Sequence, residues 1–258
     1  MNTINLETLQ YSVGTKPILL SSSQEHNIYW LGIDDETPFR CNVYMIEDGD
    51  EYIIVDPGSR SFFEQIKQRV ATIVDPSKVG GLILCHQDPD VAASMVDWLE
   101  LNPDMTIISS ARTNVLLPHY GVSDYKFFDI ASKFEWRFKS GNVLEFIEAP
   151  FLHFPGAFTT LDKNSCSLFS GDIWAALDTE WKLVVEDFTA HKTLMDLFHI
   201  DYMASNKAAL GFVQKLENKN IETIFPQHGS IIPKKYIEDA KEYLVDLECG
   251  LDLLYPEL

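Results

Sequence analysis

The sequence has few cysteines and few basic residues. Its 258 residues contain four cysteines, Cys41, Cys85, Cys166 and Cys249, which are spread along the chain and form no CxxC pair. Four scattered thiols in a chain of this length are not a disulfide framework, so we expect reduced thiols. Lysine and arginine number 20 against 39 acidic residues, for a formal net charge of −19. That charge repels phosphate and argues against nucleic acid and anionic membranes as partners.

Long apolar runs and targeting signals are absent as well. No stretch approaches the roughly 20 apolar residues of a membrane-spanning helix. The first residues, MNTINLETLQYSVGTK, lack the basic start and apolar stretch of a secretory signal. No Gly-rich dinucleotide-binding fingerprint occurs. We therefore expect a cytoplasmic protein that does not enter a membrane.

The composition that remains is typical of a globular protein, with 46% apolar and 23% charged residues. Short apolar and β-branched segments, separated by turn residues, predict strands over most of residues 1–175. Helical periodicity dominates afterwards, with no linker or repeat. The pattern predicts one α/β domain over residues 1–258, with sheets inside and helices outside. Strands are expected at 27–33, 41–49, 51–58, 79–85, 105–110, 134–138, 142–150, 165–172 and 221–227, and helices at 61–70, 91–102, 113–121, 193–220 and 234–248.

Six polar side chains share one property, because each follows an apolar run where a strand is expected to end. Loops at strand ends carry chemistry on a rigid base. Imidazoles and carboxylates together are the ligands of one or two metal ions. The six residues are His86, Asp88, Asp90, His153, Asp172 and His228.

Each of these residues also has an ordinary interpretation. Asp90 can cap the helix that follows it, Asp88 before Pro89 can form a turn, and His153 can be a hydrogen-bonded histidine. The order and number of the six residues, taken together, favour the metal site.

In this order the motifs resemble those of the metallo-β-lactamase fold, specifically the branch of flavodiiron proteins and related oxygen-binding diiron proteins. The resemblance implies an αββα sandwich of two mixed sheets flanked by helices, and it extends over essentially the whole chain. The segments that match are CHQDPD, LHFPG, FSGD and PQHGS, together with IYWLGIDD and CNVYMIEDGDEYIIVDPG.

The resemblance also implies a ligand set. One iron would be held by His86, Asp88 and His153, the other by Asp90 and His228, and Asp172 would bridge the two. The implied cofactor is a pair of iron ions, Fe²⁺ or Fe³⁺, with a bridging oxo, hydroxo or peroxo group.

Two departures from the zinc hydrolases of this fold favour iron. Those hydrolases typically carry His-x-His-x-Asp-His. In this chain Asp88 replaces the second histidine of that motif, and Val91 replaces the last one. The extra carboxylate stabilises ferric more than ferrous iron, while redox-silent zinc gains nothing from it. Val91 cannot ligate, so the second ion should keep an open position for dioxygen or nitric oxide.

Aromatic residues near the ligand loops could line a dry gas pocket or belong to the ordinary core. Among them, Tyr29 is a candidate donor of a hydrogen bond to bound oxygen. The aromatic residues are Tyr29, Trp30, Phe151, Phe154, Phe158 and Trp174. No role is assigned to His26, His119, His191 or His199.

The resemblance leaves three functions open. Flavodiiron reductases carry a flavodoxin domain after the diiron domain, for which this chain has no room, so we expect no flavin. That favours an oxygen-binding sensor, of the kind linked to bacterial chemotaxis, which needs a signalling partner. The alternative is an oxygen or nitric oxide reductase that receives electrons from a separate flavoprotein or rubredoxin, and the third is a zinc hydrolase. The resemblance also implies a homodimer with contacts near residues 193–218.

Overall fold

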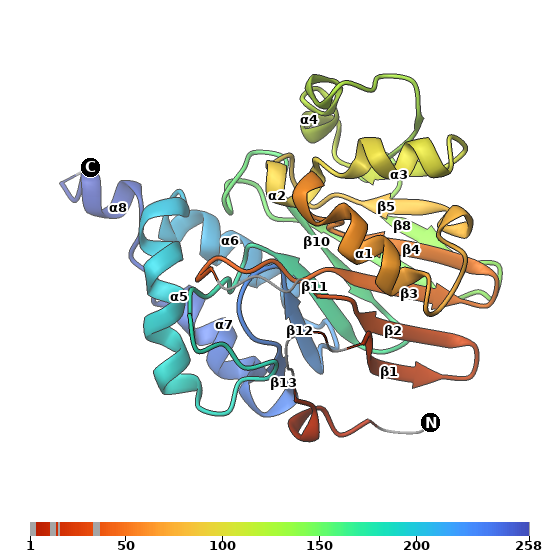
Figure 1. Cartoon of the computed structure of the whole chain (residues 1–258). Coiled ribbons are helices and arrows are strands. Elements are labelled where there is room, and N and C mark those ends of the chain that lie inside the picture. The colour runs from red at the N-terminus through yellow and green to blue at the C-terminus, as the bar shows by residue number, and fades with distance from the viewer. Residues whose placement is uncertain (1–3, 11–13, 15, 33–36, 258) are drawn as a thin grey trace.

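The first of two sheets consists of the strands β1 to β7, which lie side by side in chain order. The computed structural model describes residues 4–10, 14, 16–32 and 37–257 (Figure 1). Strands β1 to β4 pair antiparallel, and β4 to β7 pair parallel. The strands are β1 (Ile18–Ser23), β2 (His26–Trp30), β3 (Tyr44–Asp48), β4 (Glu51–Val55), β5 (Gly81–Ile83), β6 (Thr106–Ser109) and β7 (Lys126–Asp129).

The second sheet has the order β13-β12-β11-β10-β9-β8. Its pairs are antiparallel except for β11 and β12, which run parallel. Both sheets are therefore mixed. The strands are β8 (Glu135–Arg137), β9 (Val143–Glu148), β10 (Phe158–Asp162), β11 (Ser167–Gly171), β12 (Thr223–Pro226) and β13 (Ile232–Pro233).

Helices cover the two outer faces of this sandwich (Figure 1). Helices α1 and α3 pack on the first sheet, and α5, α6 and α7 pack on the second. The helices are α1 (Phe63–Val70), α2 (Pro89–Ala92), α3 (Met95–Leu101), α4 (Ala111–Asn114), α5 (Phe188–Tyr202), α6 (Asn206–Leu216), α7 (Ile237–Val245) and α8 (Leu251–Leu254). Short 3-10 turns lie at Leu6–Thr8, Arg60–Phe62, Pro76–Lys78, Leu117–Tyr120 and Lys234–Tyr236.

Side-chain alternation along the strands builds three apolar layers. In β3, Tyr44 and Ile46 face the layer between the sheets, and Met45 faces the helices of the first sheet. In β11, Phe169 faces the layer between the sheets, and Leu168 faces α5 to α7. Both sheets therefore bury two faces, as the predicted αββα sandwich of two mixed sheets requires, and that prediction is confirmed.

Several expected boundaries were wrong. The helix predicted at 91–102 is two helices, α2 and α3, and Asp90 lies inside α2, where Asp88 occupies the N-cap position without a capping bond. The segment predicted as helical at 193–220 divides into α5 and α6, because Met203 has extended backbone and the Ser205 side chain caps α6. The helix predicted at 113–121 is split into α4 and a 3-10 turn.

Four strands, β1, β7, β10 and β13, were not predicted. The strand β10 is buried at every residue, so it shows no alternation of apolar and polar residues. Two of its polar members have buried partners: the Thr159 hydroxyl donates to the Ile147 carbonyl, and Asp162 lies 2.9 Å from His26. In the described part of the chain, no helix has both the length and the apolar character needed to cross a bilayer.

Candidate metal centre

The loops that carry the six predicted ligands meet at one end of the sandwich. His86 follows β5, Asp172 follows β11 and His228 follows β12, and β11 and β12 run parallel, so their carboxyl ends share an edge. His153 lies in the β9–β10 connection, which reaches the same edge because β10 is antiparallel to β11.

Three ligand residues form a first group around one carboxylate oxygen. Ligand atoms of His86, Asp88 and His153 all lie within 4.8 Å of one another. The Nε2 atoms of His86 and His153 lie 3.2 and 3.0 Å from Oδ2 of Asp172. They lie 3.6 and 3.4 Å from Oδ2 of Asp88. Two imidazoles and a carboxylate thus surround the space next to one oxygen of Asp172.

A second group lies on the other oxygen of Asp172. Nε2 of His228 is 3.6 Å from Oδ1 of Asp172 and 3.1 Å from Oδ2 of Asp90. A third residue, which the sequence did not indicate, completes this group, because ligand atoms of Cys41, Asp90 and His228 lie within 4.8 Å of one another. Asp172 therefore directs one oxygen to each group. The six predicted residues are brought together.

Two buried polar atoms of the site have no hydrogen-bond partner among the described residues. Nδ1 of His228 donates to the Arg40 carbonyl at 3.1 Å, which leaves a lone pair on Nε2 in the neutral ring. That Nε2 is buried and has no hydrogen-bond partner in the described part of the chain, and the same is true of Oδ1 of Asp172. Buried polar atoms normally have partners. These two atoms fit metal ligands.

The charges of the site also favour a cation. Burial lowers the pKa of His153, but the Asp172 and Asp88 carboxylates outweigh it and raise that pKa to about 9. Burial likewise opposes protonation of His86, yet the charge of Asp172 raises its pKa well above the ordinary value. Burial would raise the pKa of Asp172, but His86 and its neighbours hold it well below its usual range. Without a metal, protons supply the positive charge that the carboxylates require.

Buried residues behind the first group orient His86. The Asp56 carboxylate accepts a hydrogen bond from the Cys85 backbone at 3.0 Å, and Sγ of Cys85 lies 3.1 Å from Nδ1 of His86. Burial raises the pKa of Asp56 to about 6. Gly171, just before Asp172, has φ +56°, and a Cβ there would lie 2.7 Å from Sγ of Cys85. Glycine is therefore required for the backbone to place Asp172 against His86.

A second set of contacts holds the His228 loop. The Asn42 amide donates to the Pro226 and Gly229 carbonyls at 2.9 and 2.8 Å. The Tyr44 hydroxyl donates to Pro226 at 2.8 Å. Gln227 donates to the Asp90 carboxylate at 3.3 Å. Asn42 and Tyr44 of the CNVY segment thus hold the loop of the candidate ligand His228 from the neighbouring sheet.

His199, to which the sequence gave no role, braces the Asp172 loop. Its Nε2 accepts from the Trp174 backbone at 2.9 Å, and its Nδ1 donates to the Met195 carbonyl at 2.9 Å. Burial lowers the pKa of His199 to about 4, so the ring is neutral at pH 7. The residue was missed because a helical histidine in α5 carries no local signal of a partner in another segment.

Three aromatic rings cover the ligand imidazoles. Phe39 stacks on His228 with ring centroids 3.8 Å apart. Phe198 and Tyr202 of α5 pack edge-on to His153 at 5.9 and 5.7 Å. None of these three was among the aromatic residues considered from the sequence. They form an apolar wall over both groups of ligands.

Three of the aromatic residues that the sequence did indicate belong to the core. Trp30, Phe158 and Trp174 are fully buried in the core, and Phe151 is 52% exposed. Tyr29 belongs to β2, and its hydroxyl donates to the Glu47 carboxylate at 2.8 Å. A hydrogen bond from Tyr29 to bound oxygen stays a prediction.

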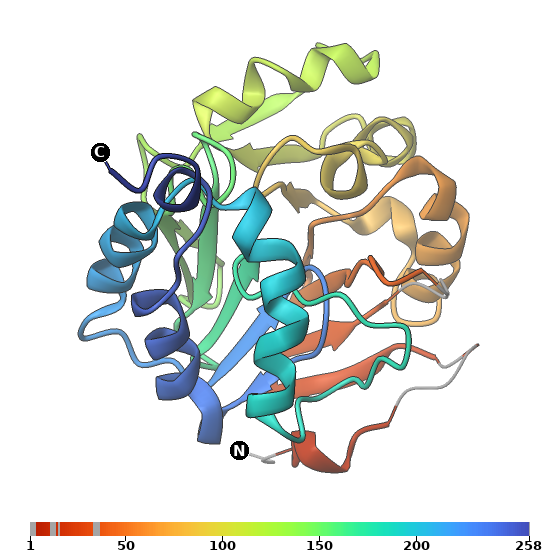
Figure 2. The ribbon, with the colours of Figure 1, turned by 90° about the vertical axis from the view of Figure 1, so that its left-hand side faces the viewer.

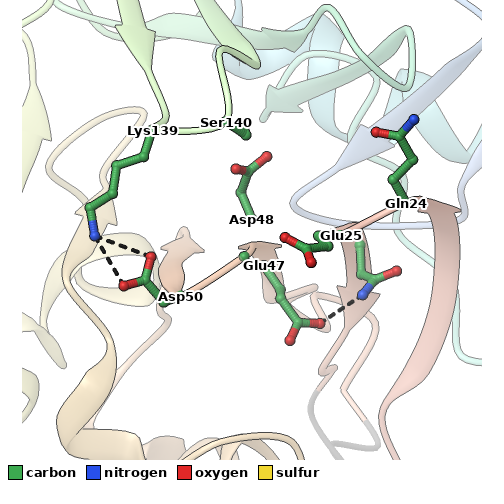
Figure 3. Close-up of a pocket in the computed structure, with 9 residues that line it drawn as sticks. Gln24, Glu25, Glu47, Asp48, Asp50, Lys139 and Ser140 are labelled. Carbon is green, nitrogen blue, oxygen red and sulfur yellow. Dashed lines mark hydrogen bonds and ion pairs between the residues drawn. The ribbon is translucent and has the colours of Figure 1, made fainter.

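A surface hollow of about 690 Å³ lies at the other end of the sandwich, around the β3–β4 turn (Figure 3). Several carboxylates line it, but they already have partners. Lys139 contacts both oxygens of Asp50 at 3.1 Å, and Glu47 accepts from Asn27 at 2.8 Å (Figure 3). Among the described residues, groups of three potential metal ligands occur only at the Asp172 end.

Comparison with known proteins shows the family to which the chain belongs. A family model described as "ODP family beta lactamase" matches residues 39–229. The chain is 26% identical over 192 residues to the putative diflavin flavoprotein A 1 of Nostoc sp., covering 74% of this chain and 33% of that protein. It is 29% identical over 201 residues to the flavo-diiron protein FprA2 of Clostridium acetobutylicum, covering 75% of this chain and 50% of that protein. The chain thus matches half or less of these relatives.

Solved structures support the same family. The peroxy diiron species of the chemotaxis sensor ODP is similar with a TM-score of 0.83 and 29% identity, over 93% of this chain and 100% of that chain. The apo state of the chemotaxis sensor ODP from T. denticola gives a TM-score of 0.82, with 29% identity over 95% of this chain and 100% of that chain. The metallo-β-lactamase-like, flavodiiron-related assignment made from the sequence motifs is confirmed.

Proposed function

We propose that this chain, which belongs to the ODP family of beta-lactamase proteins, binds dioxygen at a pair of iron ions and acts as an oxygen sensor. The similar chemotaxis sensor has a diiron species, and its whole chain matches this one. The proposal assigns the whole of residues 1–258 to a single diiron domain.

The observation that carries the proposal is the division of the Asp172 carboxylate between two groups of ligands. His86, Asp88 and His153 would hold one ion on the Oδ2 side. Asp90 and His228 would hold the other on the Oδ1 side. When bound, a pair of ferrous ions supplies electrons to dioxygen.

The residues of the chain would create the conditions for gas binding. Val91 is fully buried and offers no ligand atom, so the Asp90 side has fewer imidazoles than the His86 side. Phe39, Phe198 and Tyr202 pack against the imidazoles of His228 and His153 with apolar surface. Such a wall admits a small apolar molecule and limits water.

The test is to purify the protein without air, count its metals and then admit oxygen. We expect two iron ions per chain and a coloured species that persists for minutes. Asp172→Asn should lose both the second iron and the colour, whereas Cys166→Ser, at a site remote from the metal groups, should keep them. A native preparation that contains only zinc would overturn the proposal in favour of a hydrolase.

A second candidate is a reductase that receives electrons from a separate flavoprotein or rubredoxin. It is favoured by the nitric oxide reductase of Moorella thermoacetica, to which the chain is 27% identical over 199 residues, or 49% of that protein. Rapid oxygen or nitric oxide consumption in the presence of an added reductant would support this function. A long-lived coloured species under the same conditions would support the sensor.

The sensor proposal includes a homodimer and a signalling partner, in the cytoplasm. Helix α5 supports the dimer, since Leu197 and Ile200, three residues apart and so on one face, are 60% and 38% exposed. Isolated exposed apolar side chains are common, but a row of them marks an interface. Light scattering on the wild type and on Leu197→Glu tests the contact, and a wild-type monomer at micromolar concentration would overturn it.

A further inference from the structure

The Asp90 side of the metal centre contains a thiol that the predicted ligand set does not use. Sγ of Cys41 lies 3.8 Å from Oδ2 of Asp90. It belongs to the group whose ligand atoms all lie within 4.8 Å of one another, together with Asp90 and His228. Two ligands of one ion are separated by less than about 4.6 Å when the longest bond is about 2.3 Å. The separations of the Asp90 oxygen from the Cys41 sulfur, 3.8 Å, and from Nε2 of His228, 3.1 Å, are within this limit.

The backbone holds Cys41 against His228. The two residues pair in an isolated antiparallel bridge, and the carbonyl of Arg40, next to Cys41, accepts from Nδ1 of His228 at 3.1 Å. The same hydrogen bond leaves Nε2 of His228 buried and without a hydrogen-bond partner. One short segment thus orients the imidazole and supplies the thiol.

A comparison of the two groups shows that the thiol supplies a third ligand residue to the second group. The first group has three ligand residues, His86, Asp88 and His153. The second would have only Asp90 and His228 besides the shared Asp172, since Val91 offers no ligand atom. Cys41 raises the second group to three. Thiolate is a good ligand for iron and zinc, so its addition is chemically sound.

We propose that Cys41 ligates the second metal ion as a thiolate. On binding, the S–H bond breaks, its proton leaves to solvent, and a sulfur–metal bond forms with no change of oxidation state. The inference rests on the metal centre of the proposed function and not on its oxygen chemistry. It makes the two ions chemically unequal, one with oxygen and nitrogen ligands and the other with a sulfur ligand.

The other cysteines provide the controls. Cys85 is also buried beside the site, but its sulfur lies 3.1 Å from Nδ1 of His86, the nitrogen that points away from Asp172. Cys249 is fully buried and lies beyond α7, outside both metal groups. Cys249→Ser is therefore a matched control, because it removes a buried thiol without touching a ligand.

The test is X-ray absorption on the full chain loaded with Zn²⁺, a probe that does not react with oxygen. With two zinc ions per chain, we expect a sulfur shell at about 2.3 Å, distinct from nitrogen and oxygen at about 2.0–2.2 Å. Its amplitude should correspond to one sulfur per two metals. Cys41→Ser should lose the shell, and Cys249→Ser should keep it.

Cobalt loading gives a second, spectroscopic readout. Thiolate-to-Co²⁺ charge transfer should appear in the near-ultraviolet spectrum of the wild type and should disappear in Cys41→Ala or Cys41→Ser. Two bound ions without a sulfur shell, or a shell of equal size in the Cys41 variants, would overturn the role of Cys41 and leave the metal centre intact. Failure of the wild type to bind two ions would instead overturn the metal centre itself.

Discussion

His26 and His228 are both buried histidines with carboxylates beside them, but they lie at opposite ends of the sandwich. His26 uses both nitrogens, with Nδ1 2.7 Å from Asp48 and Nε2 2.9 Å from Asp162. His228 uses only Nδ1, on a backbone carbonyl, and its Nε2 has no hydrogen-bond partner in the described residues. The first cluster is closed, and the second is open to a ligand.

The ratio of imidazoles to carboxylates separates the two ends. At the closed end two carboxylates share one imidazole, which can neutralise part of their charge as a cation. At the open end three imidazoles meet three carboxylates, Asp88, Asp90 and Asp172. In the proposed metal centre these imidazoles would be neutral ligands, and the cation would supply the positive charge that protons supply otherwise. The closed cluster therefore joins the two sheets, and the open cluster fits the proposed metal centre.

The largest expected effect is the loss of metal in Asp172→Asn. The amide keeps the shape of the side chain but removes the charge and one of the two ligand oxygens. We expect bound metal to fall from two ions per chain to one or none, as counted by elemental analysis. The matched variant at the closed end, Asp162→Asn, should still bind two ions, and equal losses in both variants would contradict the division into open and closed clusters.

Asp162→Asn should have its main effect on the free energy of unfolding and not on metal binding. Asp162 is fully buried and joins β10 to His26 of the other sheet. Breaking a buried pair of this kind typically costs about 3–5 kcal/mol. We expect Asp162→Asn to lower the free energy of unfolding of the metal-free protein by that amount in urea titrations. A loss below about 1 kcal/mol would show that the cluster is not structural.

The closed cluster should also give a pH signature. Burial lowers the pKa of His26, but Asp162 and Asp48 outweigh it and raise that pKa above 6.5. Its contribution to stability is therefore fully present below pH 6.5 and is lost as pH rises through the folded-state value, with a slope of at most about 1.4 kcal/mol per pH unit. Asp48 behaves differently. Burial raises its pKa, but hydrogen bonds from Ser140, Asn142 and His26 outweigh burial and lower that pKa. The contribution of Asp48 to the free energy of unfolding is therefore lost only in acid.

The measurement is the difference in unfolding free energy between the wild type and His26→Gln from pH 5 to 9. Because both proteins contain the same metal-centre histidines, the difference isolates the closed cluster. It should shrink as pH rises above 6.5. A difference that grows with pH would reverse the sign and would show that His26 is neutral in the folded protein.

The smallest effect is expected for Tyr29→Phe. Its hydroxyl donates to Glu47 at 2.8 Å, on the acidic hollow at the closed end. Loss of that hydrogen bond should cost about 0.5–1.5 kcal/mol. The lifetime of the coloured oxygen species should change little, and a marked shortening would restore the role for Tyr29 that the sequence suggested.

Local patterns carried most of the fold and of the predicted ligand set. Apolar runs that end at His86, Asp172 and His228 marked strands and the loops after them, and the strands are where those runs predicted. The buried strand β10 was missed because alternation disappears when both faces are covered. The break between α5 and α6 was missed because helical periodicity continues through Met203.

The sequence by itself determined which chemical groups the metal end offers, because ligand type and position after a strand are local properties. Tertiary structure alone decided which of those groups remain without partners. The contacts that decide it join distant segments: His26 and Asp162 are 136 residues apart, and Arg40 and His228 are 188 residues apart. The places of Cys41, Phe39 and Phe198 beside the ligands depend on the same packing of one sheet on the other.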